Sequence, residues 1–254
     1  MAILSKTGSY SFLVEPFHCD FSHRLFMGHL GNHLLNAADF HSNERGYGMD
    51  YLSTVHRTWV LSRFVIEMSS MPRAYEHINI ETWVEDVMKY FTSRDFKVIG
   101  KDDTVLGYGR SIWAMIDTET RQPVDILDVR DGLINEYIEK TKQCPIAPFT
   151  RVRIGKDIPM SSSVKACYSD VDINGHVNSV KYIEHILDLW DIDWYRSHSL
   201  KRLEIAYIAE AHYGDTLSFF CDEERDGVFS VRVMKETDGV DGAKEVCRCR
   251  AEFC

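Results

Sequence analysis

The residues most able to do chemistry lie close together in residues 170–178, which read Asp-Val-Asp-Ile-Asn-Gly-His-Val-Asn. Asp172, Asn174 and His176 bring a carboxylate, an amide and an imidazole within five residues of one another. An imidazole can transfer protons near neutral pH, and an amide N–H can stabilise an oxygen that becomes negative. The pattern therefore indicates a place to stabilise an oxygen that becomes negative during a reaction, although Asp, Asn and Gly also serve ordinary turns.

The segment that follows predicts the helix that would position these groups. In residues 179–190 the apolar residues recur at spacings of three and four, as on one face of a helix: Val180, Ile183, Leu187 and Trp190. Asn178 is suited to cap that helix. The first turn of a helix has unpaired N–H donors and partial positive charge. We therefore expect these donors to help hold a developing oxyanion.

A calcium site is a poor fit to the same residues. Residues 170–175 match the start of an EF-hand loop, D-x-[DN]-x-[DN]-G. The twelfth position, which should be a bidentate Glu, is Lys181. The ligand set is therefore incomplete.

A zinc site and a cysteine nucleophile are also weakly supported. Asp172 and His176 are four residues apart, but the Asn-Gly between them argues against a regular helix there. His185 and His212 can join such a site only through folding. Cys167 can pair with His176 as a nucleophile, or simply be buried. We expect no metal and no cofactor.

Composition limits the class of protein. The chain has 254 residues, 44% of them hydrophobic, and a formal net charge of −10, which argues against non-specific nucleic-acid binding. Its seven cysteines are irregularly spaced, so a disulfide framework is not expected and a reducing compartment fits better. It has no apolar run long enough to span a membrane and no recognisable leader. The sequence predicts a soluble cytoplasmic protein.

The predicted elements occur in the same order twice. A short strand, a helix and four strands are expected at 10–19, 32–43, 59–68, 78–84, 91–99 and 105–117, and again at 163–167, 179–190, 202–211, 215–223, 228–236 and 244–253. A turn is expected at 238–242. The repeat predicts an α+β protein of two tandem units, each an antiparallel sheet around a central helix. The domains are residues 1–125 and 163–254, joined by a proline-rich linker at 126–162.

Two local similarities accompany the repeat. Residues 73–80 align with residues 211–218 at a constant offset of 138, which pairs Arg73 with Ala211. A Gly-His pair also precedes each predicted helix core, at residues 28–29 and 175–176. We expect the two units to associate side by side and so close their edge strands.

Residues 170–183 closely resemble the signature D-x-D-x-N-x-H-V-N-N-V-K-Y-I of plant and bacterial acyl-acyl-carrier-protein (acyl-ACP) thioesterases. In that family this stretch opens the helix of the second of two hot-dog folds. Weaker similarities to the family follow in the right order at residues 51–58, 80–83, 93–96, 110–115 and 203–211. The resemblance implies two tandem hot-dog domains, the first holding the acyl chain and the second the catalytic residues.

The resemblance also implies the active-site residues. They are Asp172, Asn174 and His176, with Glu210 reaching in from the strand predicted at 202–211. Ala211 stands where the family often has Cys, which favours a carboxylate mechanism over a Cys–His one. Either Glu210 activates water while Asp172 orients its neighbours, or Asp172 attacks to form an anhydride. The sequence leaves both open.

The implied reaction is hydrolysis of fatty acyl-ACP to free fatty acid and ACP, which ends chain elongation in fatty acid biosynthesis. Alternatives are an acyl-CoA thioesterase on the same fold and a non-catalytic acyl sensor. The acidic carrier would need a local basic patch, with five candidates: Arg57, Arg63, Lys165, Lys181 and Arg202. Residues around the first helix fit an acyl pocket or plain core: Leu25, Phe26, Met27, Leu34 and Leu35. Nucleic acid and membrane partners are not expected, and a monomer and a homodimer are both compatible with the sequence.

Overall fold

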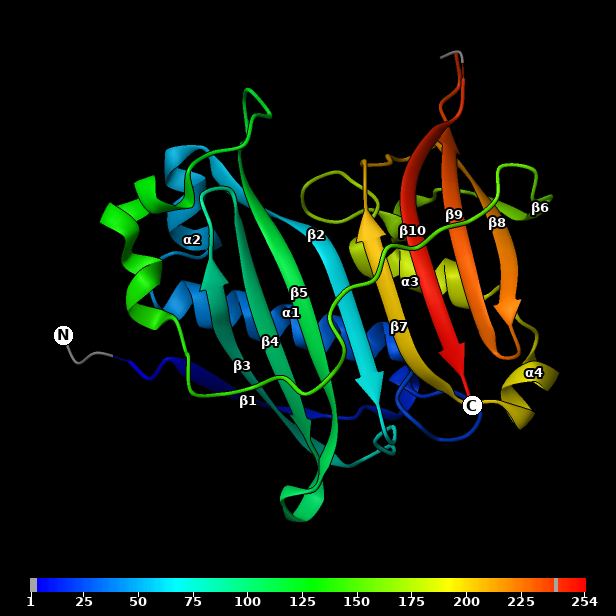
Figure 1. Ribbon diagram of the computed structural model, residues 1–254, viewed down its shortest axis with the longest axis horizontal. Helices are drawn as coiled ribbons and strands as arrows, with labels where there is room; N and C mark the ends of the chain where they lie inside the picture. The colour runs from blue at the N-terminus through cyan, green and yellow to red at the C-terminus, as the bar shows by residue number, and fades with distance from the viewer. Residues whose placement is uncertain (1–3, 240–241) are drawn as a thin grey trace. The chain divides into compact units, whose positions relative to one another are not determined.

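The computed structural model describes residues 4–239 and 242–254, and the chain divides into two compact units, Met1–Pro148 and Phe149–Cys254. Within the described residues each unit has five antiparallel strands in one sheet, with its longest α-helix against them (Figure 1). The predicted α+β class is therefore confirmed for both halves. The predicted turn at 238–242 includes residues 240 and 241, which lie outside the described residues.

The first unit orders its strands β1-β3-β4-β5-β2. Its strands and α-helices are β1 Thr7–Leu13, α1 Met27–Glu44, α2 Met49–Leu52, β2 Arg57–Met68, β3 His77–Val87, β4 Phe91–Ile99 and β5 Val105–Asp117. Its 3-10 helices are Pro16–His18, Ser53–Val55, Lys101–Asp103 and the longer Ile126–Tyr137. The bounds of β4 and β5 are those predicted from the period-two alternation of their side chains.

The helix α1 starts five residues earlier than predicted, at Met27, and ends at Glu44. Gly46 follows with φ +79°, a left-handed conformation that favours glycine and stops the helix. The Gly28-His29 pair lies inside α1, so it does not precede the helix as expected. Leu30, Leu34 and Ala37 of α1 are fully buried, which ties the helix to the core of its unit.

The segment predicted as an interdomain linker, 126–162, makes contacts in both units. Ile126, Val129 and Ile134 pack with Tyr47 and Met115 in one buried cluster of the first unit. In the second unit, Val152 is buried and its carbonyl oxygen accepts a hydrogen bond from Arg248. Much of this segment thus has packing partners, and the division between units falls at 148/149.

The second unit repeats the topology of the first, with strand order β7-β10-β9-β8-β6. Its elements are β6 Met160–Lys165, the 3-10 helix Tyr168–Asp170, α3 Ser179–Leu187, α4 Ile192–Ser197, β7 Leu200–Tyr207, β8 Thr216–Arg225, β9 Val228–Glu236 and β10 Lys244–Phe253. Read from β6, the order matches the first unit strand for strand: β6 takes the place of β1, and β7 that of β2. The two halves are therefore copies of one α+β design.

The helix α3 is shorter than predicted. Its cap is confirmed, because the Asn178 side chain accepts from the N–H of Val180 at 2.9 Å. It ends at Leu187, so Trp190 lies beyond it. The Trp190 ring instead packs edge-on against Phe229 and Phe253, with ring centroids 5.0 Å and 4.9 Å away. Trp190 is therefore spaced like a residue of the helix, but it packs against strand residues beyond the end of α3.

The duplication extends to the loop before each main helix. We call residues 16–26 the first loop and residues 168–178 the second loop. Both begin with a 3-10 turn and contain one bridge pair, Cys19–Leu25 in the first and Val171–Val177 in the second. Residue by residue, Asp20 corresponds to Asp172 and Arg24 to His176. The segments joined to these loops correspond too, because Leu25 N–H donates to Pro72 C=O and Val177 N–H donates to Ala211 C=O.

This correspondence corrects the sequence alignment of residues 73–80 with 211–218. The N–H of Arg73 donates to the Glu76 carboxylate at 2.8 Å, and the N–H of His212 donates to the Asp215 carboxylate at 2.9 Å. Arg73 therefore corresponds to His212 and not to Ala211. The alignment was one residue out of register.

Candidate active site

The second loop is closed around the carboxylate of Asp172. Its Oδ1 accepts from the N–H of Asn174 at 2.8 Å and from the N–H of His176 at 3.4 Å, while Oδ2 lies 3.5 Å from Asn174 Nδ2. Its backbone N–H donates to His176 C=O, and its C=O accepts from Gly175 N–H. Gly175 has φ +80°, which glycine adopts without strain. One short side chain thus fixes the backbone beneath the amide and the imidazole.

Asp170 anchors the same loop to α3. Its buried carboxylate accepts from the N–H of Cys167 at 2.7 Å and lies 3.0 Å from Nε2 of His185. Its carbonyl oxygen accepts from the N–H of Asn178 at 2.8 Å. The loop is therefore held at both ends and to the last turn of α3.

The sequence predicts that Glu210 lies on a strand, but the structure places it beyond the end of one. The strand β7 ends at Tyr207, so Glu210 lies in the connection that follows it. The position of this connection is set by Ala211, whose C=O accepts from Val177 N–H at 2.8 Å and whose N–H donates to the Tyr182 hydroxyl at 3.1 Å. These bonds tie the Glu210 backbone to both the second loop and α3.

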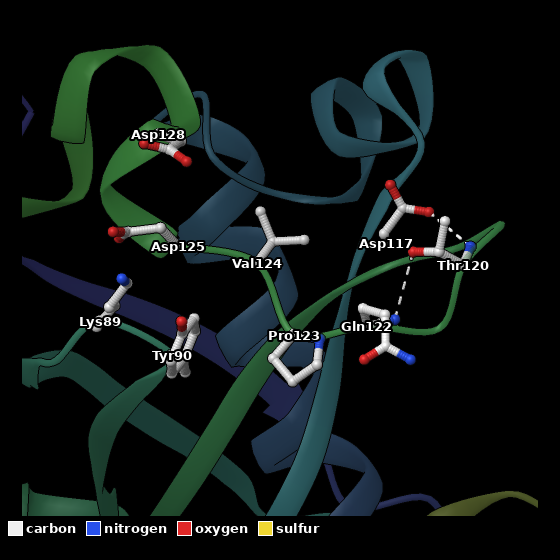
Figure 2. Close-up of a pocket in the computed structure, with 9 residues that line it drawn as sticks. All are labelled: Lys89, Tyr90, Asp117, Thr120, Gln122, Pro123, Val124, Asp125 and Asp128. Carbon is white, nitrogen blue, oxygen red and sulfur yellow. Dashed lines mark hydrogen bonds between the residues drawn. The ribbon is translucent and has the colours of Figure 1, made fainter.

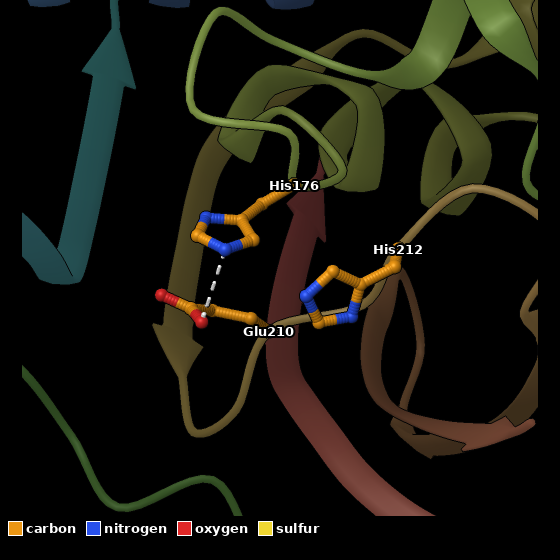
Figure 3. A group of neighbouring side chains, drawn as sticks. All are labelled: His176, Glu210 and His212. Atoms are coloured by element: carbon orange, nitrogen blue, oxygen red, sulfur yellow. Dashed lines mark ion pairs between the residues drawn. The ribbon is translucent and has the colours of Figure 1, made fainter. Parts of the chain in front are cut away.

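The predicted residues His176 and Glu210 are brought together. Nε2 of His176 lies 3.3 Å from Oε2 of Glu210, and Figure 3 shows the imidazole directed at the carboxylate. Both side chains are partly exposed, at 24% and 34%. An imidazole N–H can orient such a carboxylate and exchange a proton with it. The geometry joins the two segments that the sequence placed more than thirty residues apart.

A residue that sequence reasoning treated only as a distant zinc ligand, His212, also belongs to this group. Its ring lies edge-on to His176 with centroids 5.0 Å apart. The only sign of His212 in the sequence is that it follows Glu210 by two residues. Its side chain faces the site because the chain turns after Ala211. The buried Asp215 accepts from its backbone N–H. Burial raises the pKa of Asp215, but this hydrogen bond and those from Thr237 and Lys235 lower it overall, which keeps the carboxylate ionised.

The N-terminus of α3 offers fewer free donors than expected. The N–H of Val180 is taken by the Asn178 side chain, and the N–H of Lys181 donates to Asn178 C=O at 2.9 Å. The Asn174 side chain, in contrast, is exposed beside the loop. The thiol of Cys167 donates to the Lys165 carbonyl at 3.1 Å. The amide of Asn174 is the predicted group for polarising a carbonyl, and its exposure leaves it accessible to a substrate.

A separate open hollow of about 400 Å³ lies in the first unit (Figure 2). Three of its lining residues are carboxylates, but two of these have structural partners. Asp117 accepts from the N–H groups of Glu119 and Thr120 and pairs with Arg57, and Asp125 accepts from the N–H of Leu127. We therefore place the candidate active site at His176 and Glu210.

Two family models match the chain and together cover most of it. Residues 6–136 match the acyl-ACP thioesterase N-terminal domain, and residues 156–252 match the acyl-ACP thioesterase C-terminal domain. The chain therefore belongs to the acyl-ACP thioesterase family, as the resemblance of residues 170–183 predicted.

Relatives with assigned names support the same family. The chain is 26% identical over 229 residues, or 83% of its length, to the chloroplastic oleoyl-acyl carrier protein thioesterase of Coriandrum sativum. It is 24% identical over 232 residues, or 87% of its length, to the chloroplastic dodecanoyl-[acyl-carrier-protein] hydrolase of Cinnamomum camphora. The chain spans 61% of the length of each of these two relatives.

Solved structures show the fold. The crystal structure of an acyl-ACP thioesterase from Bacteroides thetaiotaomicron is 46% identical, with a TM-score of 0.87 over 98% of each chain. The 12:0-ACP thioesterase from Umbellularia californica has a TM-score of 0.82 at 19% identity, covering 100% of this chain and 99% of the other, which is a likeness of fold. Two tandem hot-dog domains, each an antiparallel sheet around a helix, were predicted and are confirmed.

Proposed function

We propose that this chain hydrolyses the thioester of fatty acyl-ACP and releases free fatty acid and ACP, ending chain elongation in fatty acid biosynthesis. The observation that carries the proposal is the contact of Glu210 with His176, which belongs to the second loop that matches the family signature. The relatives named as ACP thioesterases support the same reaction. No metal or cofactor is needed for the steps described below.

Three side chains divide the chemistry in this proposal. The Asn174 amide donates to the thioester carbonyl oxygen and stabilises the negative charge that develops on it. Glu210 accepts a proton from water as the water oxygen bonds to the carbonyl carbon. The tetrahedral intermediate then collapses, the carbon–sulfur bond breaks, and the leaving thiolate receives that proton by way of His176. Glu210 ends as a carboxylate, ready for another turnover.

Asp172 is assigned a positioning role. Its carboxylate already accepts hydrogen bonds from the N–H groups of Asn174 and His176, which favours holding the loop over attacking the substrate. A single turnover in ¹⁸O-labelled water tests this. Direct attack by water puts the label only in the fatty acid, whereas an anhydride on Asp172 opened at the aspartyl carbon leaves the label in the protein. Labelled Asp172 in a digest would overturn the assignment.

Hydrolysis rates distinguish an acyl-ACP substrate from an acyl-CoA substrate. Matched acyl-ACP and acyl-CoA substrates over a panel of chain lengths should give higher kcat/KM for ACP, and equal or higher values for CoA would defeat the ACP proposal. The basic patch predicted for ACP needs one correction, because Arg202 is buried and bonded to Glu204. Lys165 is exposed and Lys181 partly so, and both remain candidates. Binding through such residues should weaken as salt rises.

The acyl chain is assigned to the first unit and catalysis to the second. Leu25, Met27 and Leu34 are buried around the start of α1, where apolar side chains would meet an acyl tail. A non-catalytic acyl sensor is the rival function, and it would bind acyl-ACP without hydrolysing any chain length in the same panel.

We also propose a cytoplasmic location, on the support of seven free cysteines in the described residues. None of the helices in the described residues is long and apolar enough to span a membrane. Fractionation of the cells that produce the protein tests the location, and recovery outside the cytoplasm would contradict it. Oligomeric state, monomer or homodimer, is open to measurement by light scattering.

A further inference from the structure

Three potential metal ligands converge beside the second loop (Figure 3). Donor atoms of His176, Glu210 and His212 all lie within 4.8 Å of one another. His176 Nε2 and Glu210 Oε2 are 3.3 Å apart, close to the separation of about 3.3 Å between two ligands on a tetrahedral zinc ion with bonds of about 2.0–2.1 Å. The His212 side chain is about half exposed, so a small rotation can bring its nitrogen to the same ion.

The orientation of His212 supports a ligand role. Its Nδ1 lies 3.9 Å from Oδ2 of Asp215, and its backbone N–H donates to the same oxygen. Figure 3 shows the other ring nitrogen directed toward Glu210. Asp215 is itself held by Thr237 and Lys235. Metal-binding histidines commonly have such a carboxylate behind the ring, which fixes the tautomer and the direction of the free nitrogen.

We propose that His176, Glu210 and His212 form a binding site for a zinc ion, and that zinc bound there stops thioester hydrolysis. Two imidazoles and one carboxylate suit zinc, whereas calcium and magnesium take oxygen ligands. Three protein ligands leave the fourth tetrahedral position open. The inhibitory part rests on the proposed function, because it concerns the same side chains.

Inhibition follows from what the ion would occupy. Zinc takes the lone pairs of Glu210 and His176, so the carboxylate no longer accepts a proton from water and the imidazole no longer passes one to sulfur. The released carrier thiol is a further reason, because a thiolate is a strong zinc ligand and would fill the open position. Zinc would therefore hold the enzyme with its product bound, and a chelator would release it.

Zinc affinity is measured directly, by competition with a fluorescent zinc indicator. The background protein has the exposed thiols removed by Cys167→Ser and Cys254→Ser, since thiols bind zinc on their own. His212→Gln removes one proposed ligand, and His77→Gln removes an exposed imidazole of β3 as the matched control. His212→Gln should weaken the tightest site by about tenfold or more, while His77→Gln should leave it unchanged. Equal affinities in all three proteins would overturn the site.

The inhibitory effect is measured separately, as the hydrolysis rate of each protein with zinc divided by its own rate with a chelator. The background protein and the His77→Gln variant should lose most of their activity as zinc fills the site, and EDTA should restore it. The His212→Gln variant should need about tenfold more zinc for the same fractional loss. Zinc that binds the site without slowing hydrolysis would overturn the inhibitory role. If the chain binds zinc but hydrolyses no thioester even with chelator, the proposed function fails while the site stands.

Discussion

The first and second loops share their backbone hydrogen bonds, but only the second has the side chains proposed for hydrolysis. In each, an aspartate side chain accepts from the N–H two residues on at 2.8 Å: Asp20 from Ser22, and Asp172 from Asn174. In each, the residue that follows has a positive φ, His23 at +60° and Gly175 at +80°. The main chain therefore does not determine where the chemistry occurs.

The side chains on that backbone make the difference. Arg24 stands where the second loop has His176, and Met71, the residue before Pro72, stands where the second unit has Glu210. A guanidinium cannot shuttle protons near neutral pH, and a thioether cannot accept one from water. The same loop backbone thus serves structure in the first unit and, in the proposed mechanism, catalysis in the second. Paired substitutions at corresponding positions separate these two roles.

The largest expected effect is loss of the proposed base. Glu210→Gln keeps the size of the side chain and one acceptor oxygen but removes its capacity to accept a proton, so kcat should fall by about 10³-fold. The matched change in the first unit, Met71→Gln, should alter kcat by less than about twofold. Steady-state rates on acyl-ACP measure both. A comparable loss in the two variants would show that the units do not divide the work as proposed.

The next effect comes from giving the second loop the side chain of the first. The first loop shows that this backbone accepts an arginine, so His176→Arg should fold normally while kcat falls by about 10²-fold or more. Circular dichroism checks folding and the same assay checks rate. The reciprocal Arg24→His should leave the rate unchanged. A His176→Arg protein with near-normal activity would remove His176 from the mechanism.

Acid should act on the first unit through a buried histidine. His41 of α1 is fully buried between Lys6 C=O and the Tyr47 hydroxyl, and burial, with Arg94 and Arg45 nearby, lowers its pKa to about 2. The unfolded chain takes up that proton below about pH 6.5, but the folded chain does not. The free energy of unfolding should therefore fall by about 1.4 kcal/mol per pH unit below that point.

A variant isolates this acid effect from the rest of the chain. Between about pH 7.5 and pH 5, wild-type protein should lose about 2 kcal/mol more than His41→Gln, as measured by urea unfolding. Equal pH slopes for the two proteins would show that His41 is not the group that titrates.

The smallest effect separates structure from catalysis at the two aspartates. Asp20→Ala and Asp172→Ala each remove one acceptor of loop N–H groups, so each should lower the free energy of unfolding by about 1 kcal/mol. Only Asp172→Ala should slow hydrolysis, by about tenfold, because the amide and imidazole above it become less well placed. Complete loss of activity in Asp172→Ala would instead favour direct attack by Asp172.

Much of the fold was readable from local pattern. The strands β4, β5, β9 and β10 have the predicted bounds because side chains alternate and turn residues flank them. The sequence does not reveal the start of α1 because its N-cap residue, Phe26, has no side chain that can cap a helix. The sequence pairs Arg73 with Ala211 instead of His212 because corresponding hydrogen bonds, and not similar residue types, define the match.

The site was only partly predictable. The family signature predicts Asp172, Asn174 and His176 because they lie within one short segment, and the structure places His176 against Glu210. The sequence of residues 200–207 is typical of a strand and does not indicate that the strand ends before Glu210. His212 joins the group through a turn whose geometry depends on Ala211 and Tyr182, which are far apart in sequence. Local pattern cannot report contacts of that range.

The hydrogen bonds that close the second loop should also slow its exchange with solvent. Asn174 and Gly175 are exposed, yet their amide protons are held by Asp172 at 2.8 Å and 3.0 Å. Deuterium can replace them only when the loop opens, and opening breaks several of these bonds together. The amides of residues 174–176 should therefore exchange at similar, slow rates. An arriving thioester would then meet a backbone that needs no rearrangement before the reaction.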